Sequence, residues 1–447
     1  MTRLAIPDGG KRASLSRDEI VRLDRAHVWH PYTPVDTWEK TAPIVVARAE
    51  GSSLYDADGT RYIDGNASWW VAALGHSHPR LVRVVREQAE TLAHCALAGI
   101  AHEPSSALAA ELVRVAPPGL SRVFYSDDGS TAVEVAVKIA LQTWQHRGAP
   151  QKTRFVALDG AFHGDTVGAS SLGGVELFRR PFACVLFECV RAPFPDPAAY
   201  ERAFETIREL ITREHGTIAA VVVEPLVQGA AGMRTYDPDF LRALRELTRA
   251  LDVLLIVDEV FTGYGRTGTM FACEQAGITP DVMCIGKAFS SIIPMAATLV
   301  TDAVYDAFRG RDDRALWYGH TFCGNPIGAA LAREVLAIYE DEGVVAQASA
   351  KAPRISAAFE RIRAIPGVAR VRTLGMIGAA DLEGSTGYLG QAGWRVYEEA
   401  RQRGAYLRPL GDTVYVCPPL VIDERDLDDL LQILEDSVRA ALPAFLG

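Results

Sequence analysis

Two short apolar runs, each followed by a charged side chain, most constrain what this chain can fold into. Residues 254–257 read Leu-Leu-Ile-Val and are followed by Asp258 and Glu259, and residues 282–285 are followed by Gly286 and Lys287. Runs of this kind are typical of parallel strands that are buried on both faces. Open α/β sheets bind ligands beyond the carboxyl ends of their strands. The pattern therefore predicts that an acid and an amine meet at one edge of one sheet.

This pair of residues matches what pyridoxal phosphate chemistry needs. A lysine holds the aldehyde of that cofactor as a Schiff base, and an aspartate keeps the pyridine nitrogen protonated so that the ring can accept electrons. We therefore predict Lys287 and Asp258 as catalytic residues. Each has a plainer interpretation when taken singly, because an Asp-Glu pair at a strand end is commonly a solvated loop entry or a metal ligand, and a lysine after a glycine commonly lies at the surface. Their joint occurrence, together with the further motifs of the chain, favours the cofactor site.

Length and composition limit the class of protein. A chain of 447 residues is too long for one simple core and suggests two domains. The formal net charge of -10 and the lack of a basic block argue against a nucleic-acid partner. The seven cysteines show no paired spacing, so we expect neither a disulfide framework nor a metal site. Residues 1–16 read as a flexible lead-in, no run is long enough to span a membrane, and we predict a cytoplasmic protein that acts on small molecules.

Strands and helices alternate along the middle of the chain, which predicts an α/β fold. Alternation of this kind is typical of a mostly parallel sheet with helices on both faces. The pattern predicts a long helix at 129–145 and strands at 122–126, 154–158, 184–187, 218–223 and 296–300.

The two ends of the chain follow a different pattern. Residues 44–64 predict a small antiparallel meander, and from about residue 344 helices and paired strands are grouped as in an α+β domain. We therefore predict a large domain at residues 67–336 and a smaller domain built from residues 1–66 and 337–447.

Two other features are candidates for a binding site. Gly129 and Ser130 open the predicted helix after a strand, where free backbone N–H groups and the helix dipole favour a phosphate, although ordinary helix caps look similar. The adjacent side chains of Trp69 and Trp70 cannot both face one core. At least one of them is free to line a pocket, although a subunit interface would use it equally well.

Two single side chains complete the candidates. Phe162, in a Gly-Ala-Phe-His-Gly loop, could stack on a planar cofactor or pack in the core, and its spacing does not decide between them. Arg408, beside Pro409, is either a solvated arginine or a fork aimed at a substrate carboxylate.

With these residues assembled, the chain resembles the fold-type I, class III pyridoxal-phosphate-dependent aminotransferases over nearly its whole length. Within that family it is most similar to the branch that converts 8-amino-7-oxononanoate to 7,8-diaminononanoate in biotin synthesis. The resemblance implies a large domain with a mostly parallel seven-stranded sheet, a smaller α+β domain, bound pyridoxal 5'-phosphate, and a homodimer with shared active sites. The segments that carry it are HVWHPYTP (27–34), DGNASWW (64–70), VEPLVQGAAGM (223–233), GRTG (265–268), GHTFCGNP (319–326) and RPLGDTVYVCPP (408–419).

The resemblance also implies roles for individual residues. Lys287 would carry the cofactor and move the proton at the substrate carbon, Asp258 would pair with the pyridinium, and Tyr32 is a third catalytic candidate. Arg408 would meet the carboxylate of the long keto-amino acid, and Arg266 matches a further position of the family pattern. The implied cofactor-binding residues are Gly129, Ser130, Phe162, Asp258, Val260 and Lys287, with His320 and Thr321 of the partner subunit. The implied substrate-binding residues are Tyr32, Trp69, Trp70, Phe162, Lys287, Gly319 and Arg408.

Two departures from the family pattern bear on the amino donor and on the substrate. Members commonly carry Thr-Gly-Gly shortly after the lysine, whereas residues 288–294 here read AFSSIIP. Users of S-adenosyl-L-methionine typically carry a tyrosine where this chain has Phe162, and a lysine-using branch carries phenylalanine. We predict S-adenosyl-L-methionine as donor, with lysine as the alternative. Another class III aminotransferase of diamines or ω-amino acids, and a non-catalytic protein that retains the fold, are further alternatives.

Overall fold

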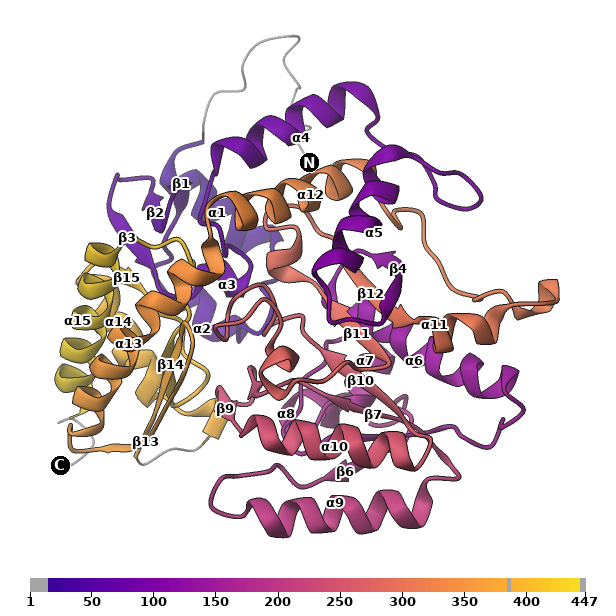
Figure 1. Cartoon of the computed structure of the whole chain (residues 1–447). Helices are drawn as coiled ribbons and strands as arrows, with labels where there is room; N and C mark the ends of the chain where they lie inside the picture. The colour runs from indigo at the N-terminus through magenta and orange to yellow at the C-terminus, as the bar shows by residue number, and fades with distance from the viewer. Residues whose placement is uncertain (1–14, 384–386, 443–447) are drawn as a thin grey trace.

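The computed structural model describes residues 15–383 and 387–442, and its arrangement is shown in Figure 1. The predicted lead-in at residues 1–16 lies outside the described residues except for its last two positions. In the described part of the chain, no helix is long and apolar enough to cross a membrane.

A seven-stranded sheet forms the centre of the molecule. Its strand order is β4-β12-β11-β10-β7-β5-β6, and all neighbours run parallel except β12, which runs antiparallel to both β11 and β4. The mostly parallel sheet of the predicted fold is therefore confirmed. The strands span Leu120–Ser126 (β4), Arg154–Leu158 (β5), Cys189–Ala192 (β6), Ile218–Val223 (β7), Leu254–Asp258 (β10), Val282–Ile285 (β11) and Ala296–Thr301 (β12).

Helices cover both faces of this sheet, because alternate residues of each strand point to opposite sides. Leu255 and Val257 of β10 join the hydrophobic cluster that includes α10 (Pro238–Ala250), whereas Leu254 and Ile256 join the cluster that includes α6 (Gly129–His146). Every residue of β7 and β10 is buried. The continuous apolar runs in the sequence thus reflect strands enclosed between two helical layers.

One predicted strand was misplaced. The apolar run at residues 184–187 does not form a strand; the structure places β6 at Cys189–Ala192 instead. Phe187 packs on Phe155 with ring centroids 5.7 Å apart, whereas Cys184 and Val185 are exposed, so this irregular segment meets the core only at its end. Because β6 is an edge strand that pairs only with β5, three of its four residues are half-buried, and its sequence carries a weak strand signal.

Two smaller sheets lie beside the central one. The first has the order β1-β2-β3-β15, so the predicted N-terminal meander is joined by a strand near the C-terminus; β3 and β15 pair in parallel. The second is antiparallel, with the order β13-β14-β16. The shared first sheet supports the division at residues 66 and 336, which we keep as a proposal. The strands span Val46–Glu50 (β1), Ser53–Asp56 (β2), Arg61–Asp64 (β3), Val368–Leu374 (β13), Ile377–Leu382 (β14), Ala405–Tyr406 (β15) and Thr413–Val416 (β16).

The remaining elements connect and cover these sheets. The strands β8 and β9 span Val227–Gln228 and Arg234–Thr235 and form a two-stranded ribbon. The other α-helices are Arg17–His27 (α1), Val35–Lys40 (α2), Ala67–Trp70 (α3), Pro79–Thr91 (α4), Glu103–Val115 (α5), Val167–Leu172 (α7), Glu176–Arg179 (α8), Tyr200–Glu214 (α9), Asp302–Tyr305 (α11), Pro326–Asp341 (α12), Val344–Arg363 (α13), Ala392–Gln402 (α14) and Glu424–Ala441 (α15).

Candidate active site

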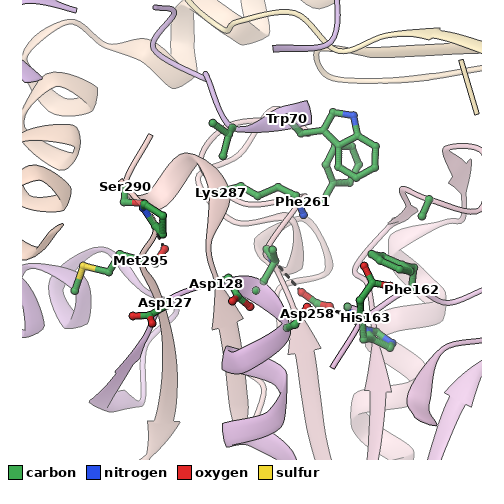
Figure 2. A pocket seen from close by; sticks show the side chains of 18 of the residues that line it. Trp70, Asp127, Asp128, Phe162, His163, Asp258, Phe261, Lys287, Ser290 and Met295 are labelled. Atoms are coloured by element: carbon green, nitrogen blue, oxygen red, sulfur yellow. Dashed lines mark hydrogen bonds and ion pairs between the residues drawn. The ribbon is translucent and has the colours of Figure 1, made fainter. Parts of the chain in front are cut away.

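A cavity of about 570 Å³ opens beyond the carboxyl ends of β10 and β11. Asp258 ends β10 and Lys287 follows β11, and both line the cavity, as Figure 2 shows. The structure therefore brings together the acid and the amine that the strand pattern places at one edge of the sheet. Five other candidates from the sequence also line this cavity: Trp70, Gly129, Ser130, Phe162 and Val260.

Lys287 is half-buried in the cavity wall and has a strained backbone. Its backbone φ is +50°, which lies in the left-handed region. This conformation is energetically unfavourable for any residue that has a Cβ atom. Its Nζ lies 5.2 Å from the centroid of the Trp70 ring. Burial lowers the pKa of Lys287, and the nearby carboxylates of Asp258 and Glu224 partly oppose this. The amine therefore reaches its neutral, basic form at a lower pH than an exposed lysine does.

The two neighbouring carboxylates at the end of β10 do different things. Asp258 faces the cavity, where its Oδ2 accepts a hydrogen bond of 2.8 Å from His163 Nδ1. Glu259 points away and accepts hydrogen bonds from Thr262 Oγ1 at 2.5 Å and from the backbone N–H of Cys273 at 2.8 Å. Burial raises the pKa of Glu259 to about 7. Glu259 therefore stabilises the loop after β10, and Asp258 is the carboxylate available to a ligand.

The start of α6 forms an anion-binding wall of the cavity. Asp128 caps the helix by accepting the backbone N–H of Thr131 at 2.9 Å, and Gly129 and Ser130 follow it. The first N–H groups of a helix have no partner inside the helix and favour a phosphate. A Cβ added to Gly129 would lie 2.5 Å from Cγ1 of Val260, so glycine is required for this close approach of backbone and side chain.

Sequence reasoning missed two buried residues of the cavity, His163 and Glu224. The Nε2 atom of His163 has no hydrogen-bond partner among the described residues. Glu224 accepts the backbone N–H of Phe162 at 3.1 Å and that of Gly229 at 3.0 Å, and burial raises its pKa to about 7. Glu224 directly follows the buried strand β7 much as Asp258 ends β10, so the same sequence pattern could have found it. His163 lies in a loop, and the only sequence feature that pointed to this loop as part of a site was its neighbour Phe162.

A cluster of three other candidates lies beside the cavity. Tyr32 OH donates hydrogen bonds of 2.6 and 2.7 Å to the carboxylate of Asp165, which lines the cavity. Burial and Asp165 raise the pKa of Tyr32. The Trp69 ring lies 5.8 Å from the Tyr32 ring and 5.1 Å from Cζ of Arg408. Arg408 also donates to the backbone oxygen of Tyr32 at 3.4 Å. These contacts join segments from both ends of the chain.

Trp69 and Trp70 come from a turn of unusual handedness. The residues Ala67, Ser68, Trp69 and Trp70 have φ values of 45, 46, 64 and 74°, so α3 is a left-handed turn of residues that all carry a Cβ. Left-handed backbone costs about 1–2 kcal/mol for each such residue. Trp70 is 5% exposed and lines the cavity, whereas Trp69 is 42% exposed and contacts Tyr32 and Arg408.

The remaining candidates do not line the cavity of a single chain. Gly319, His320 and Thr321 lie outside its lining, although His320 Nδ1 approaches the cavity residue Asp127 to 3.5 Å. Arg266 is buried and donates to the backbone oxygen of Pro418 at 2.6 Å.

Comparison with known proteins agrees with this architecture. The model of the family described as aminotransferase class-III matches residues 35–438. An adenosylmethionine-8-amino-7-oxononanoate aminotransferase of Geobacter sulfurreducens is 41% identical over 435 residues, covering 93% of this chain and 96% of that protein. The crystal structure of the enzyme of the same name from Methanocaldococcus jannaschii matches with a TM-score of 0.92 and 33% identity, covering 96% of this chain and 100% of the other. An (S)-enantioselective ω-transaminase from Thermomicrobium roseum matches with a TM-score of 0.91 and 30% identity, covering 97% and 100%.

The fold, the cavity and these matches are those of a pyridoxal-phosphate-dependent aminotransferase. More particularly, the chain belongs to the class III aminotransferase family. The residues present fit the cofactor, because a half-buried lysine, a carboxylate held by a histidine, and a helix start where glycine permits close approach all line one cavity.

Proposed function

We propose that this protein aminates 8-amino-7-oxononanoate to 7,8-diaminononanoate, a step of biotin synthesis, with S-adenosyl-L-methionine as the amino donor. The observation that carries the proposal is the joint placement of Lys287 and Asp258 in one cavity with the Trp69 and Arg408 cluster beside it. The names of the relatives from Geobacter sulfurreducens and Methanocaldococcus jannaschii support the acceptor and the donor.

The residues of the cavity divide the chemical work between them. When bound, pyridoxal phosphate supplies an electron sink that stabilises negative charge on the carbon next to the transferred amino group. Lys287 would hold the cofactor and would move a proton to and from that carbon through Nζ. Asp258, oriented by His163, would pair with the pyridine nitrogen, and the start of α6 would hold the phosphate.

The cluster beside the cavity suits the proposed acceptor. A keto-amino acid with a long methylene chain needs an apolar wall and one charged contact for its carboxylate. Trp69 and Tyr32 supply aromatic surface, and the guanidinium of Arg408 lies between Trp69 and Trp394, with Cζ 5.1 and 5.6 Å from their ring centroids. We propose that Arg408 binds the carboxylate and that these aromatic rings contact the methylene chain.

We also propose a homodimer in which His320 and Thr321 of the partner subunit complete each cofactor site. Trp317 is 70% exposed and Phe322 is 53% exposed in a single chain. These large apolar side chains lie near His320 and Thr321, which supports the proposal that a partner subunit covers this surface.

All seven cysteines are free thiols, which supports the predicted cytoplasmic location.

The donor has a competitor, and so does the acceptor. Phe162 lacks the hydroxyl that would give a polar contact to S-adenosyl-L-methionine, and this favours lysine as the alternative donor. The similarity to an ω-transaminase keeps diamines and ω-amino acids as alternative substrates. The lysine alternative forms the same diamine from a different amino donor, whereas the ω-transaminase alternative acts on different substrates.

Steady-state assays with mass-spectrometric detection of the product test the proposal. We expect 7,8-diaminononanoate to form from 8-amino-7-oxononanoate and S-adenosyl-L-methionine, and a Lys287→Ala control to form none. Formation of 7,8-diaminononanoate with lysine but not with S-adenosyl-L-methionine would show that lysine is the donor. The proposed acceptor would then stand. Turnover of putrescine or β-alanine without any turnover of 8-amino-7-oxononanoate would refute the proposed function.

A further inference from the structure

The left-handed turn of residues 67–70 places its two tryptophans in different parts of the site. Trp70 packs on Phe261 at 4.5 Å between ring centroids and lies 5.2 Å from Nζ of Lys287. Trp69 faces the Arg408 side chain, as described above. Consecutive side chains of an extended strand would point to opposite faces of a sheet, whereas this left-handed turn directs both rings to neighbouring parts of one site, so their directions depend on its conformation.

A buried carboxylate, Asp64, is hydrogen-bonded to this turn. Its Oδ1 accepts the backbone N–H of Asn66 at 3.2 Å, and its Oδ2 accepts the hydroxyl of Ser68 at 2.9 Å and Nε2 of His76 at 2.9 Å. The Asp64 side chain is fully buried and lies outside the cavity lining. Asp64 therefore connects the turn, through Asn66 and Ser68, to the segment that carries His76.

The backbone of His76 is hydrogen-bonded to Gly51, which lies between β1 and β2 of the four-stranded sheet. The backbone N–H of His76 donates to the oxygen of Gly51 at 2.8 Å, and Gly51 donates in return to His76 at 3.1 Å. The backbone N–H of Asp64 donates to the oxygen of Ser52 at 2.8 Å. Asp64 thus connects the strained turn to the β1–β2 hairpin, which lies outside the cavity lining. Strained backbone persists only where the surroundings over-determine it.

We propose that Asp64 is a positioning residue that holds the left-handed turn through Ser68 and His76, and that it thereby orients Trp69 and Trp70 for the keto acceptor. The kinetic part of this inference rests on the proposed function, because it names the same acceptor. The structural part does not, since the hydrogen bonds of the turn exist without a substrate.

Hydrogen exchange of the holoenzyme, measured by mass spectrometry, tests the structural part. The turn contains backbone hydrogen bonds of 2.9 Å from Trp70 to Asn66 and from Val71 to Ala67. Asp64→Asn leaves one acceptor oxygen in place of two, so we expect the amides of residues 66–72 to exchange at least tenfold faster. The matched control is Asp56→Asn, in which an aspartate of the same sheet loses its charge; Asp56 accepts the backbone N–H of Asp58 and of Thr60 in a surface turn. We expect no change at residues 66–72 in that control.

Kinetics of the same variants test the orientation of the tryptophans. We expect the KM for 8-amino-7-oxononanoate to rise at least tenfold in Asp64→Asn, with cofactor content unchanged, and to stay at the wild-type value in Asp56→Asn. Ser68→Ala, at an exposed position, gives a milder test if Asp64→Asn fails to fold, with an expected rise of about threefold in KM and in exchange at residues 66–72.

Two results would overturn the inference. One is wild-type exchange at residues 66–72 in Asp64→Asn, or in Ser68→Ala if the former does not fold. The other is faster exchange at the turn with an unchanged KM. A wild-type enzyme that does not turn over 8-amino-7-oxononanoate would refute the proposed acceptor instead, and the exchange measurement would then decide on the role of Asp64 alone.

Discussion

Replacing Glu224 by Gln should change how the stability of the cofactor-free protein depends on pH. Glu224 is buried in the cavity wall, and burial raises its pKa from 4.5 to about 7. Below about pH 4.5 the folded and unfolded states both hold this proton, so the stability associated with it is fully present. Between these pH values the unfolded chain releases the proton first, and a rising pH therefore favours unfolding. Above about pH 7 this stability is lost.

The size of the effect follows from the pKa. One pKa unit corresponds to about 1.4 kcal/mol, so Glu224 should lower the free energy of unfolding by about 3 kcal/mol on going from about pH 4 to about pH 8. The Glu224→Gln variant lacks this dependence, and loss of the Glu224 charge also removes one of the carboxylates that raise the pKa of Lys287. The difference in unfolding free energy between variant and wild type should therefore shift by about 3 kcal/mol in favour of the variant over this range.

Urea denaturation of both proteins, followed by far-UV circular dichroism at several pH values, measures this difference. The cofactor is removed beforehand because its phosphate and ring would change the charges near Glu224. Glu188→Gln, at a side chain that is 82% exposed, controls for the loss of one carboxyl group. Parallel stability curves for Glu224→Gln and wild type between about pH 4 and pH 8 would refute the reasoning.

Three further predictions concern the site itself. Arg408→Ala should raise the KM for the keto acceptor by about 10- to 100-fold with little change in kcat, because a charged hydrogen bond contributes about 1.5–3 kcal/mol; an unchanged KM in steady-state kinetics would remove Arg408 from the proposed pocket. Gly129→Ala should weaken cofactor binding at least tenfold, since its Cβ would lie 2.5 Å from Val260, and an unchanged dissociation constant in absorbance titration would contradict the close approach. Phe162→Tyr should raise kcat/KM for S-adenosyl-L-methionine relative to lysine; an unchanged ratio in competition assays would show that this hydroxyl does not select the donor.

The central part of the fold was predictable from sequence because its strands are buried on both faces. Continuous apolar runs such as those of β7 and β10 are typical of strands that helices cover on both sides of a sheet. The edge strand β6 was misplaced because one neighbour and partial burial impose little pattern on its residues. The apolar run at residues 184–187 gave a stronger strand pattern, although Phe187 is its residue that packs against the core.

The candidate site was predictable where a residue ends a buried strand or begins a helix. Asp258, Lys287 and Gly129 all occupy such positions, and the structure places them in one cavity. The contact between His163 and Asp258 joins residues 95 apart in sequence, and no local pattern reports it. The left-handed turn of residues 67–70 was equally hidden, because these residue types disfavour that conformation and only tertiary contacts impose it.

The central claim is that Lys287 and its cavity transfer an amino group to 8-amino-7-oxononanoate. Rapid mixing of the purified holoenzyme with S-adenosyl-L-methionine, followed at the visible absorbance band of the cofactor, tests it most directly. We predict that the donor bleaches this band and that a subsequent addition of 8-amino-7-oxononanoate restores it. A band that is bleached by neither S-adenosyl-L-methionine nor lysine, or that is bleached but not restored by this acceptor, would contradict the account.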